Sequence, residues 1–367
     1  MMGCIPVKSI FLGKPSSRDM DRFDHSIIQV GDSCFEFYTP NEPLDHLNVS
    51  DWTFDIPFSV TLDEFFSNHK VRSFAIIQND TVKYSFNGVS FDSESLHPSY
   101  SIAKSFTSAL IGIAIEEGLI KSEKELVKDY VPELKELDHS DKLTVEHLLN
   151  HTSGLNYKLT TDATLYYGRN SLNSLKRLRF DTIPGAKQHY LNMNVQLLGI
   201  ILERATNMSP SQYLQEKIWQ PLGMEHSAQW MVDAQGNELP MGGLALSLHD
   251  WARLGLLYAN GGRWGDKQIL PASWVKESVI PDAPHLQPGD NPASYYKFGY
   301  QYQWWVPQNP DDDFMALGIW GQTIYVNPKQ KVVIVKLSAD MNSFSEKAEL
   351  AQIEYIQALS RSLAVTH

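Results

Sequence analysis

The sequence predicts a mixed α/β fold in which one antiparallel sheet is assembled from two distant parts of the chain. Two runs rich in β-branched and aromatic residues, 73–78 and 81–86, flank Asn79-Asp80 and are typical of a β-hairpin. A second hairpin is predicted near the other end, from strands at 322–326 and 331–337. Helical patterns fill the middle. This order predicts a sheet flanked by helices together with a mostly helical domain.

The N-terminal part precedes the first hairpin. Residues 1–58 are rich in Pro, Asp, Ser and Asn and have no regular hydrophobic period, so they are expected to wrap the body as long loops. Thr61 and Glu64 form a capping box, with Thr at the N-cap and Glu at the third helical position. A short helix is therefore predicted through about Lys70.

The middle of the chain is predicted to be helical. The segment 101–118 is apolar on nearly all sides from Ala109 to Ile115, which indicates a buried helix that stops at Gly118. Further helices are expected over 145–150, 195–205, 210–219 and from Ser247 to Asn260. The helix over 210–219 has Ser209 as its N-cap and Pro210 as its first residue, which is a typical helix start.

The last third contains most of the strands. Residues 298–304 alternate with period two and predict one strand, and a closing helix is expected over 345–360. Aromatic residues alternating on a strand are usually core, so Tyr302, Trp304 and Trp305 are read as core residues first and cleft-lining residues second. The predicted division is 1–98 (N-terminal wrap and first strands), 99–240 (mostly helical) and 241–367 (remaining strands and C-terminal helix).

Composition excludes several classes of function. The chain has 367 residues, with 31 Lys+Arg against 43 Asp+Glu, and a formal net charge of −12 at pH 7. Sequence-independent nucleic-acid binding needs a basic surface, so neither a nucleic acid nor an anionic membrane is an expected partner. A small-molecule substrate is expected instead. Oligomeric state cannot be predicted from these numbers.

Metal and disulfide chemistry are not expected. The sequence has two cysteines, Cys4 and Cys34, which excludes a disulfide framework or a cysteine-based zinc site. His147 and His151 are four residues apart, but the sequence supplies no evident third ligand and no His-Glu-x-x-His motif. No metal and no cofactor are predicted.

The N-terminal sequence indicates the expected cellular compartment. It lacks a basic segment followed by an apolar one, so no signal peptide is predicted and a cytoplasmic location is expected. Met2-Gly3-Cys4 resembles the end of a lipoprotein cleavage site, and a periplasmic or lipoprotein location is the alternative if the true start lies upstream. The longest uncharged apolar run, between Lys104 and Glu116, has eleven residues. A bilayer span needs about 20.

Ser101 and Lys104 are the first candidate catalytic pair. Positions i and i+3 share one face of a helix, so the hydroxyl and the amine are expected side by side. A lysine in the first turn of a buried helix loses hydration and tends toward the neutral amine, which can activate a nucleophilic hydroxyl. The alternative is an ordinary serine N-cap with a lysine reaching solvent, since Ser-x-x-Lys alone occurs often by chance.

Further motifs follow this tetrad in a fixed order. They are His151-Thr152-Ser153-Gly154, Pro184-Gly185-Ala186, Tyr190-Leu191-Asn192, Trp219-Gln220-Pro221-Leu222-Gly223-Met224, Gly242-Gly243-Leu244 and Gly318-Ile319-Trp320-Gly321-Gln322. In this order and spacing the chain resembles the serine β-lactamase-like hydrolases, which include class C β-lactamases, D-alanyl-D-alanine peptidases and esterases. Within them it is most similar to the 6-aminohexanoate-dimer-hydrolase group. The resemblance covers about residues 74–337.

The resemblance implies roles for individual residues. It implies a β-lactamase/transpeptidase-like fold with the active site between the sheet and the helical domain, and no cofactor. Ser101 would be the acylated nucleophile and Lys104 its proton partner. Tyr190 would be a second base that carries the proton to the leaving group, with Lys104 close enough to favour the phenolate. Asn192 would orient Lys104 or a substrate amide.

The cleft strand departs from the pattern of the wider family. β-Lactamases and peptidases carry Lys-Thr-Gly or Lys-Ser-Gly there, and this sequence has Gly318-Ile319-Trp320-Gly321 instead. The N–H of Ile319 would complete an oxyanion hole with the N–H of Ser101. Gly318, Trp320 and Gly243 are expected beside the substrate. Tyr166 and Tyr167 lie where this branch supplies a substrate-contacting tyrosine, with surface aromatics as the equal alternative.

The function predicted from these residues is hydrolysis of small amides or esters through an acyl-enzyme intermediate on Ser101. The alternative is a β-lactamase or D-alanyl-D-alanine carboxypeptidase, which the absence of Lys-Thr-Gly disfavours. A catalytically silent binding module is the less favoured third possibility. The sequence does not identify the substrate.

Overall fold

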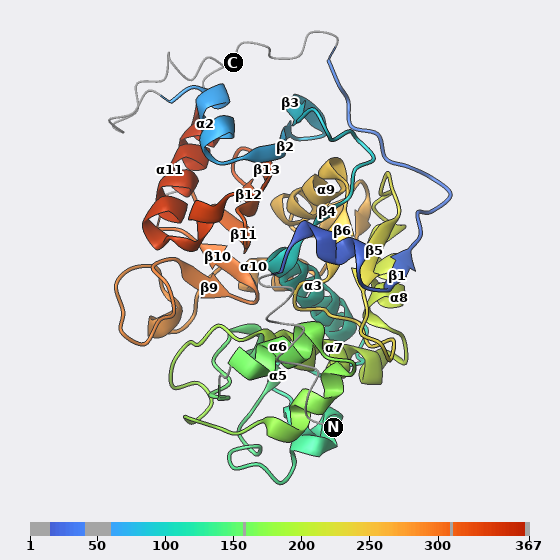
Figure 1. The fold of residues 1–367 in the computed structure, drawn as a ribbon, viewed down its shortest axis with the longest axis vertical. Coiled ribbons are helices and arrows are strands. Elements are labelled where there is room, and N and C mark those ends of the chain that lie inside the picture. The colour runs from blue at the N-terminus through green and yellow to red at the C-terminus, as the bar shows by residue number, and fades with distance from the viewer. Residues whose placement is uncertain (1–14, 41–59, 157–158, 309–310, 364–367) are drawn as a thin grey trace.

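The computed structural model describes residues 15–40, 60–156, 159–308 and 311–363. Its main feature is a seven-stranded antiparallel sheet with the order β3-β2-β13-β12-β11-β10-β9 (Figure 1). The strands are β2 (Val71–Gln78), β3 (Thr81–Asn87), β9 (Gly299–Gln301), β10 (Trp304–Val306), β11 (Phe314–Gly318), β12 (Gln322–Asn327) and β13 (Val332–Ser338). Strand β13 pairs with β2, so two segments that are far apart in the sequence are neighbours in the sheet. The predicted mixed fold and both predicted hairpins are confirmed.

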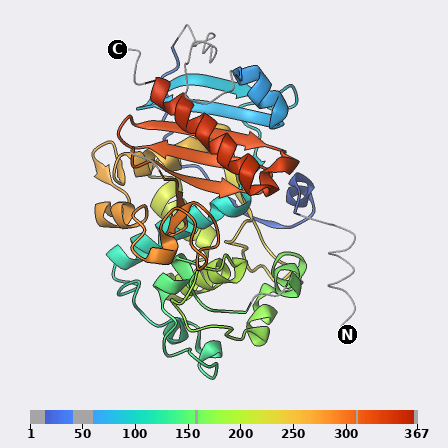
Figure 2. The same cartoon turned by 90° about the vertical axis from the view of Figure 1, so that its left-hand side faces the viewer.

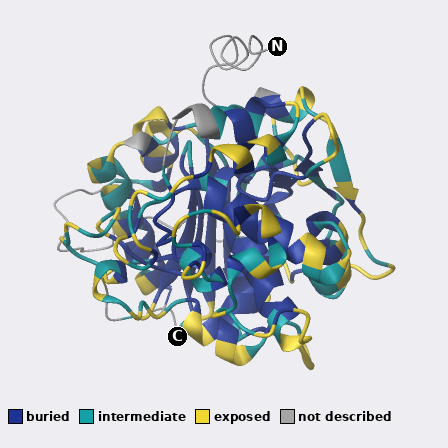
Figure 3. Cartoon of the chain, turned by 90° about the horizontal axis from the view of Figure 1, so that it is seen from below, coloured by how far each residue is buried: buried dark blue, intermediate teal, exposed yellow. Residues whose placement is uncertain are grey.

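Helices cover both faces of this sheet. Alternate residues of β13 point to opposite sides, so Val333 and Val335 join the core beneath α9 (Leu248–Ala259), whereas Val332 and Ile334 join a second core beneath α11 (Glu346–Ser362) and α2 (Leu62–Asn68). Figure 2 shows α11 lying across its face of the sheet. Viewed from below, the strands between these helices are buried (Figure 3).

A mostly helical part lies below the sheet in Figures 1 and 2. It contains α3 (Ala103–Glu116), α4 (Val127–Tyr130), α5 (Val145–Leu149), α6 (Leu159–Tyr167), α7 (Asn192–Thr206) and α8 (Pro210–Leu214). Helix α3 packs against α7 and is buried on all sides from Ala103 to Ala114, as its apolar sequence predicts. A 3-10 turn, η3 (Tyr100–Ile102), leads into it.

The N-terminal segment is more regular than the sequence predicts. Strand β1 (His25–Ile28) pairs with β5 (Ala228–Met231) in a second sheet of order β1-β5-β6-β4, which also contains β6 (Leu244–Leu246) and β4 (His97–Pro98). The expectation of long loops over 1–58 is therefore wrong for β1. Its hydrogen-bonding partner lies some two hundred residues later, so local sequence gives no sign of it. Residues 1–14, with Cys4, and 41–59 lie outside the described residues.

Several predicted helices are confirmed with small differences. Helix α2 begins at the predicted capping box, where Glu64 N–H donates to Thr61 Oγ1 over 3.2 Å. Helices α9 and α11 also lie where expected. The helix predicted over 210–219 is regular only as α8, because it widens into a π turn over Gln215–Trp219.

The single strand predicted over 298–304 is wrong. The chain forms a tight hairpin instead, β9 to β10, with Tyr302 and Gln303 at the turn at φ +40° and +71°. Neither is a glycine, so this backbone is strained and needs support from outside the hairpin. Asn150 Oδ1 accepts the N–H of Tyr302 over 2.9 Å, and the carbonyl of Gln303 accepts the Ser105 hydroxyl over 2.8 Å.

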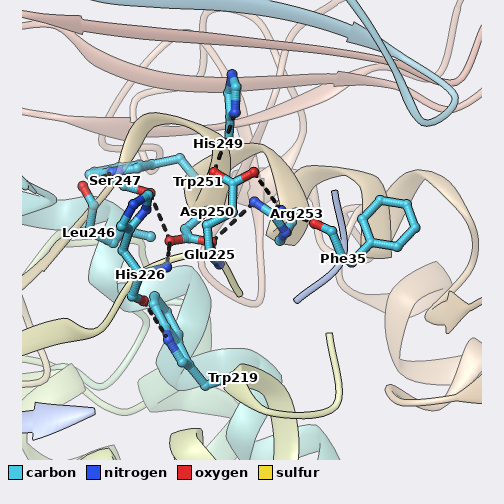
Figure 4. Close-up of polar contacts among 10 residues, drawn as sticks. All are labelled: Phe35, Trp219, Glu225, His226, Leu246, Ser247, His249, Asp250, Trp251 and Arg253. Carbon is cyan, nitrogen blue, oxygen red and sulfur yellow. Dashed lines mark hydrogen bonds and ion pairs between the residues drawn. The ribbon is translucent and has the colours of Figure 1, made fainter. Parts of the chain in front are cut away.

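A buried ionic network ties the N-terminal segment to α9 (Figure 4). The Arg253 side chain is fully buried and lies 3.1 Å from Asp250 Oδ1 and 3.0 Å from Glu225 Oε1. It also donates to the carbonyl of Phe35. Asp250 in turn accepts the backbone N–H groups of Glu225 and His226 over 2.8 and 3.1 Å. Because each charge is paired, the network is tolerated in the interior.

Within the described ranges, no helix combines the length and the apolar composition that crossing a bilayer requires.

Candidate active site

Ser101 and Lys104 meet at the start of the buried helix. Ser101 lies in η3 and Lys104 in the first turn of α3, and Lys104 Nζ donates to Ser101 Oγ over 2.9 Å. The same nitrogen donates to the carbonyl of Met241 over 2.5 Å. Tyr100, directly before the serine, has φ +45° and is not a glycine. Such strained backbone is characteristic of functional sites and here presents the serine at the helix start.

Burial shifts the protonation of Lys104. Its side chain is 1% exposed, and this loss of hydration lowers its pKa from 10.5 to about 7, although Asp162 acts in the opposite direction. A large share of the amine is therefore neutral near pH 7. A neutral amine that contacts a hydroxyl is able to accept its proton.

Tyr190 completes the group from the other side. Its ring centroid lies 5.2 Å from Lys104 Nζ, and a hydrogen bond with Ser101 acts on its hydroxyl. Burial raises the pKa of Tyr190 above its usual value, and this effect exceeds the lowering effect of Ser101. The resting hydroxyl is therefore protonated, which favours a proton donor over the phenolate that the resemblance implies.

His151 holds Tyr190 in place. The two rings lie with centroids 4.3 Å apart. Because the N–H of Leu191 donates to His151 Nδ1 over 3.1 Å, the ring proton is on Nε2, which faces Gln303 Oε1 at 3.1 Å. Burial and the nearby Lys104 hold the pKa of His151 well below 6.5, so the ring is neutral. Sequence analysis missed this role, although His151 stands inside one of the quoted motifs.

A cavity of about 150 Å³ opens beside the nucleophile. Four of its lining residues are predicted site residues, namely Ser101, Tyr190, Gly318 and Ile319. Trp305, which was read from the sequence as a core residue first and a cleft-lining residue second, also lines it. The other described lining residues were not predicted, and they are Tyr295, Tyr296, Leu317, Ser343 and Glu349. The unpredicted residues come from the loop before β9, from β11, and from the C-terminal helical region. Only the fold brings them near residue 101.

The end of β11 forms part of the cavity wall. A Cβ atom on Gly318 would lie 2.7 Å from the carbonyl oxygen of Ser99, so only glycine allows this approach. Residues 318–321 make a tight turn closed by Gly321 N–H to Gly318 O over 3.2 Å, with Trp320 at φ +67°. Within the described chain, the N–H of Ile319 has no hydrogen-bond acceptor. This free donor at the cleft is suited to an oxyanion.

The other predicted contact residues lie elsewhere. Tyr166 and Tyr167, on α6, pack against Phe23 with centroid distances of 5.9 and 6.1 Å. Gly243 packs against Met231, where an added Cβ would lie 2.9 Å from Cβ of that residue. Trp320 turns away and donates through Nε1 to the carbonyl of Pro15 over 2.8 Å. Of the described residues that line the cavity, none is Tyr166, Tyr167, Asn192, Gly243 or Trp320.

The two histidines singled out in the sequence form hydrogen bonds with different partners. His147 Nδ1 contacts the Thr144 hydroxyl at 2.9 Å, whereas both nitrogens of His151 serve the hydrogen bonds described above. In the part of the chain that the structure covers, no three His, Cys, Asp or Glu side chains are grouped to hold a metal ion.

The site lies between an antiparallel sheet and a helical part. In it a serine accepts a hydrogen bond from a buried lysine, and a buried tyrosine lies beside them. This is the arrangement of a serine acyl-transfer hydrolase. The chain belongs to the β-lactamase family of serine hydrolases, since the family model described as Beta-lactamase matches residues 72–358. This confirms the predicted family and fold.

Individual relatives agree with this assignment. The 6-aminohexanoate-dimer hydrolase of Paenarthrobacter ureafaciens is 24% identical over 287 residues, covering 73% of this chain and 72% of that protein. A solved structure from Bacillus anthracis, named as a candidate 6-aminohexanoate-dimer hydrolase, has a TM-score of 0.82 and 25% identity over 93% of this chain and 92% of its own. EstCE1, described as a hydrolase with promiscuous acyltransferase activity, shares the fold, with a TM-score of 0.63 and 17% identity over 81% of this chain and 96% of its own.

Proposed function

We propose that this chain hydrolyses small esters or linear amides through an acyl-enzyme intermediate on Ser101. The observation that carries the proposal is the 2.9 Å contact between Ser101 Oγ and the fully buried amine of Lys104 at the edge of a cavity. The relationship to a named 6-aminohexanoate-dimer hydrolase, which acts on a linear amide by its name, supports the substrate class.

The proposed reaction begins with proton transfer. Neutral Lys104 accepts the Ser101 proton while Oγ attacks the substrate carbonyl carbon, and the oxygen that becomes negative points to the N–H of Ile319 and that of Ser101. Tyr190 gives its proton to the departing alcohol or amine and is reprotonated from Lys104. Water then attacks the ester carbonyl of the acyl-enzyme by the same route in reverse, which frees the acid and Ser101.

The cavity lining bears on which acyl compounds react. No lysine or arginine occurs among its described lining residues. A substrate carboxylate would therefore lack the charge-assisted hydrogen bond that contributes about 1.5–3 kcal/mol. Neutral esters and amides are expected to react faster than penicillins or peptides ending in D-alanyl-D-alanine.

A labelling experiment tests the proposal. The full-length chain is incubated with a fluorophosphonate probe and digested, and the modified peptide is identified by mass spectrometry. Modification at Ser101, together with turnover of nitrophenyl esters or linear amides, is the expected result. A protein that neither reacts with the probe nor hydrolyses any ester, amide or chromogenic cephalosporin would be a silent binding module. Faster turnover of the cephalosporin than of nitrophenyl acetate would indicate a β-lactamase.

A further inference from the structure

The cavity next to Ser101 has aromatic walls. Tyr190 stacks on Tyr295 and on Trp305, with centroid distances of 5.6 Å in both cases, and Tyr296 meets Trp305 edge to face at 5.7 Å. All four side chains line the cavity. The face of an aromatic ring carries partial negative charge, so several faces around one small space favour a cation there.

Among the described residues that line the same space there is one carboxylate. Glu349, on α11, accepts a hydrogen bond from the Tyr296 hydroxyl over 2.7 Å, and this bond fixes the carboxylate beside an aromatic wall. None of the described basic side chains forms an ion pair with it. A carboxylate that is held in place, partly buried and not in direct contact with a cation is able to pair with a cationic group of a ligand.

Two interactions partly offset the effect of burial on this carboxylate. Burial raises the pKa of Glu349 above its usual value, and the Tyr296 hydrogen bond and the charge of Lys336 oppose this increase only in part. Lys336 is itself fully buried behind the cleft, on β13, and donates to Gln352 Oε1 over 2.6 Å. It therefore acts on Glu349 at a distance and leaves its oxygens available on the cavity side. Asp162 adds negative potential at Tyr295.

We propose that the cavity binds an organic ammonium group of the substrate, with Glu349 as its counter-charge and Tyr295, Tyr296 and Trp305 as its aromatic walls. The inference rests on the proposed function, because it names the substrate class that Ser101 would act on. The volume fits: an engineered protein cavity of about 150 Å³ holds benzene, and a trimethylammonium group is of similar size. Substrates would be esters or amides that carry a cationic amine near the scissile carbonyl.

Binding is tested first, because it does not depend on turnover. Choline and its uncharged carbon analogue 3,3-dimethylbutan-1-ol have nearly the same shape, and each is titrated into the full-length chain by calorimetry. Choline is expected to bind at least about tenfold more tightly, from the cation–π and carboxylate contacts together. Glu349→Gln keeps the shape and an acceptor for Tyr296, and it is expected to reduce the preference to about threefold or less.

A matched control comes from the same helix. Glu354 is exposed on α11, so Glu354→Gln removes the same charge away from the cavity and is expected to keep the wild-type preference. A second variant, Tyr295→Leu, removes one aromatic face from a side chain that is 50% exposed and so carries little folding risk. It is also expected to reduce the preference for choline. Equal binding of the two probes by the wild-type chain would overturn the inference.

Turnover then separates this inference from the proposed function. Acetylcholine and 3,3-dimethylbutyl acetate are compared by kcat/KM in the wild-type and Glu349→Gln chains. A charge preference that disappears in Glu349→Gln supports the inference. Hydrolysis of both esters at equal rates contradicts it and leaves the proposed function intact. Binding of choline without fluorophosphonate labelling or hydrolysis would contradict the proposed function and retain the ammonium site.

Discussion

The imidazole of His151 lies against the ring of Tyr190, with 4.3 Å between the two ring centroids. Its nitrogens are occupied by Leu191 N–H and Gln303 Oε1, so the ring has one orientation and one tautomer. His151 therefore connects the strained β9–β10 turn to Tyr190, the proposed proton donor, and we propose it as a positioning residue.

We expect His151→Asn to lower kcat more than it changes KM. The variant retains an acceptor for Leu191 N–H but removes the ring on which Tyr190 packs, and a misplacement of about 1 Å can reduce rates by about 100-fold. Steady-state kinetics on a nitrophenyl ester measure the effect, with a thermal melt to establish folding. An increase in KM at constant kcat would contradict a positioning role.

We expect Ser101→Ala to reduce ester hydrolysis by at least about 10³-fold, because the nucleophile has no substitute. Fluorophosphonate labelling should disappear as well. The melting temperature is expected to stay near that of the wild type, because the substitution removes only the side-chain hydrogen bonds of Ser101 with Lys104 and Tyr190 and leaves the backbone unchanged. Residual activity of one tenth or more would show that another residue is the nucleophile.

Lys104 and Tyr190 are expected to act as one unit. Lys104→Ala, Tyr190→Phe and the double variant should therefore lose similar amounts of kcat, since groups that share one proton path are not additive. Kinetics of the three proteins on one ester provide the comparison. Losses that multiply in the double variant would show two independent contributions.

The rate should depend on pH through Lys104. Its pKa is lowered to about 7 and only the neutral amine accepts the serine proton, so kcat/KM is expected to rise with pH and level off above that value. A pH profile from 5 to 9 measures this, with enzyme stability checked at each pH. A rate that falls as pH rises from 6 to 8 would be incompatible with Lys104 as the base.

The buried network around Arg253 is expected to contribute more to the free energy of unfolding than a surface ion pair does. Asp250→Ala leaves the guanidinium without its fully buried partner, and such a loss costs about 3–5 kcal/mol. The control is Glu133→Gln, which removes a pair with Arg204 in which the Glu133 side chain is 46% exposed. Exposed pairs contribute about 0–1 kcal/mol. Denaturant unfolding of both variants measures the difference, and equal losses would contradict the assignment.

The local sequence predicts the helices that are specified by residues within their own segments. Helix α2 follows from its capping box, and α3 from its uninterrupted apolar residues. The turn at Tyr302 and Gln303 could not be predicted, because Asn150 and Ser105 stabilise a backbone that these two residues rarely adopt. Ser101 and Lys104 were found because they are three residues apart, whereas Glu349 belongs to the same cavity only through the packing of α11 on the sheet.

The pairing of β13 with β2 has a consequence for folding of the newly made chain. Strand β2 emerges from the ribosome early, and its neighbour β13 is translated more than 250 residues later, at about 5–20 residues per second. During that interval one edge of the first hairpin lacks its partner strand. Non-local pairing of this kind folds slowly and exposes aggregation-prone edges. Demand for chaperones is therefore expected to be highest just before the C-terminal strands appear.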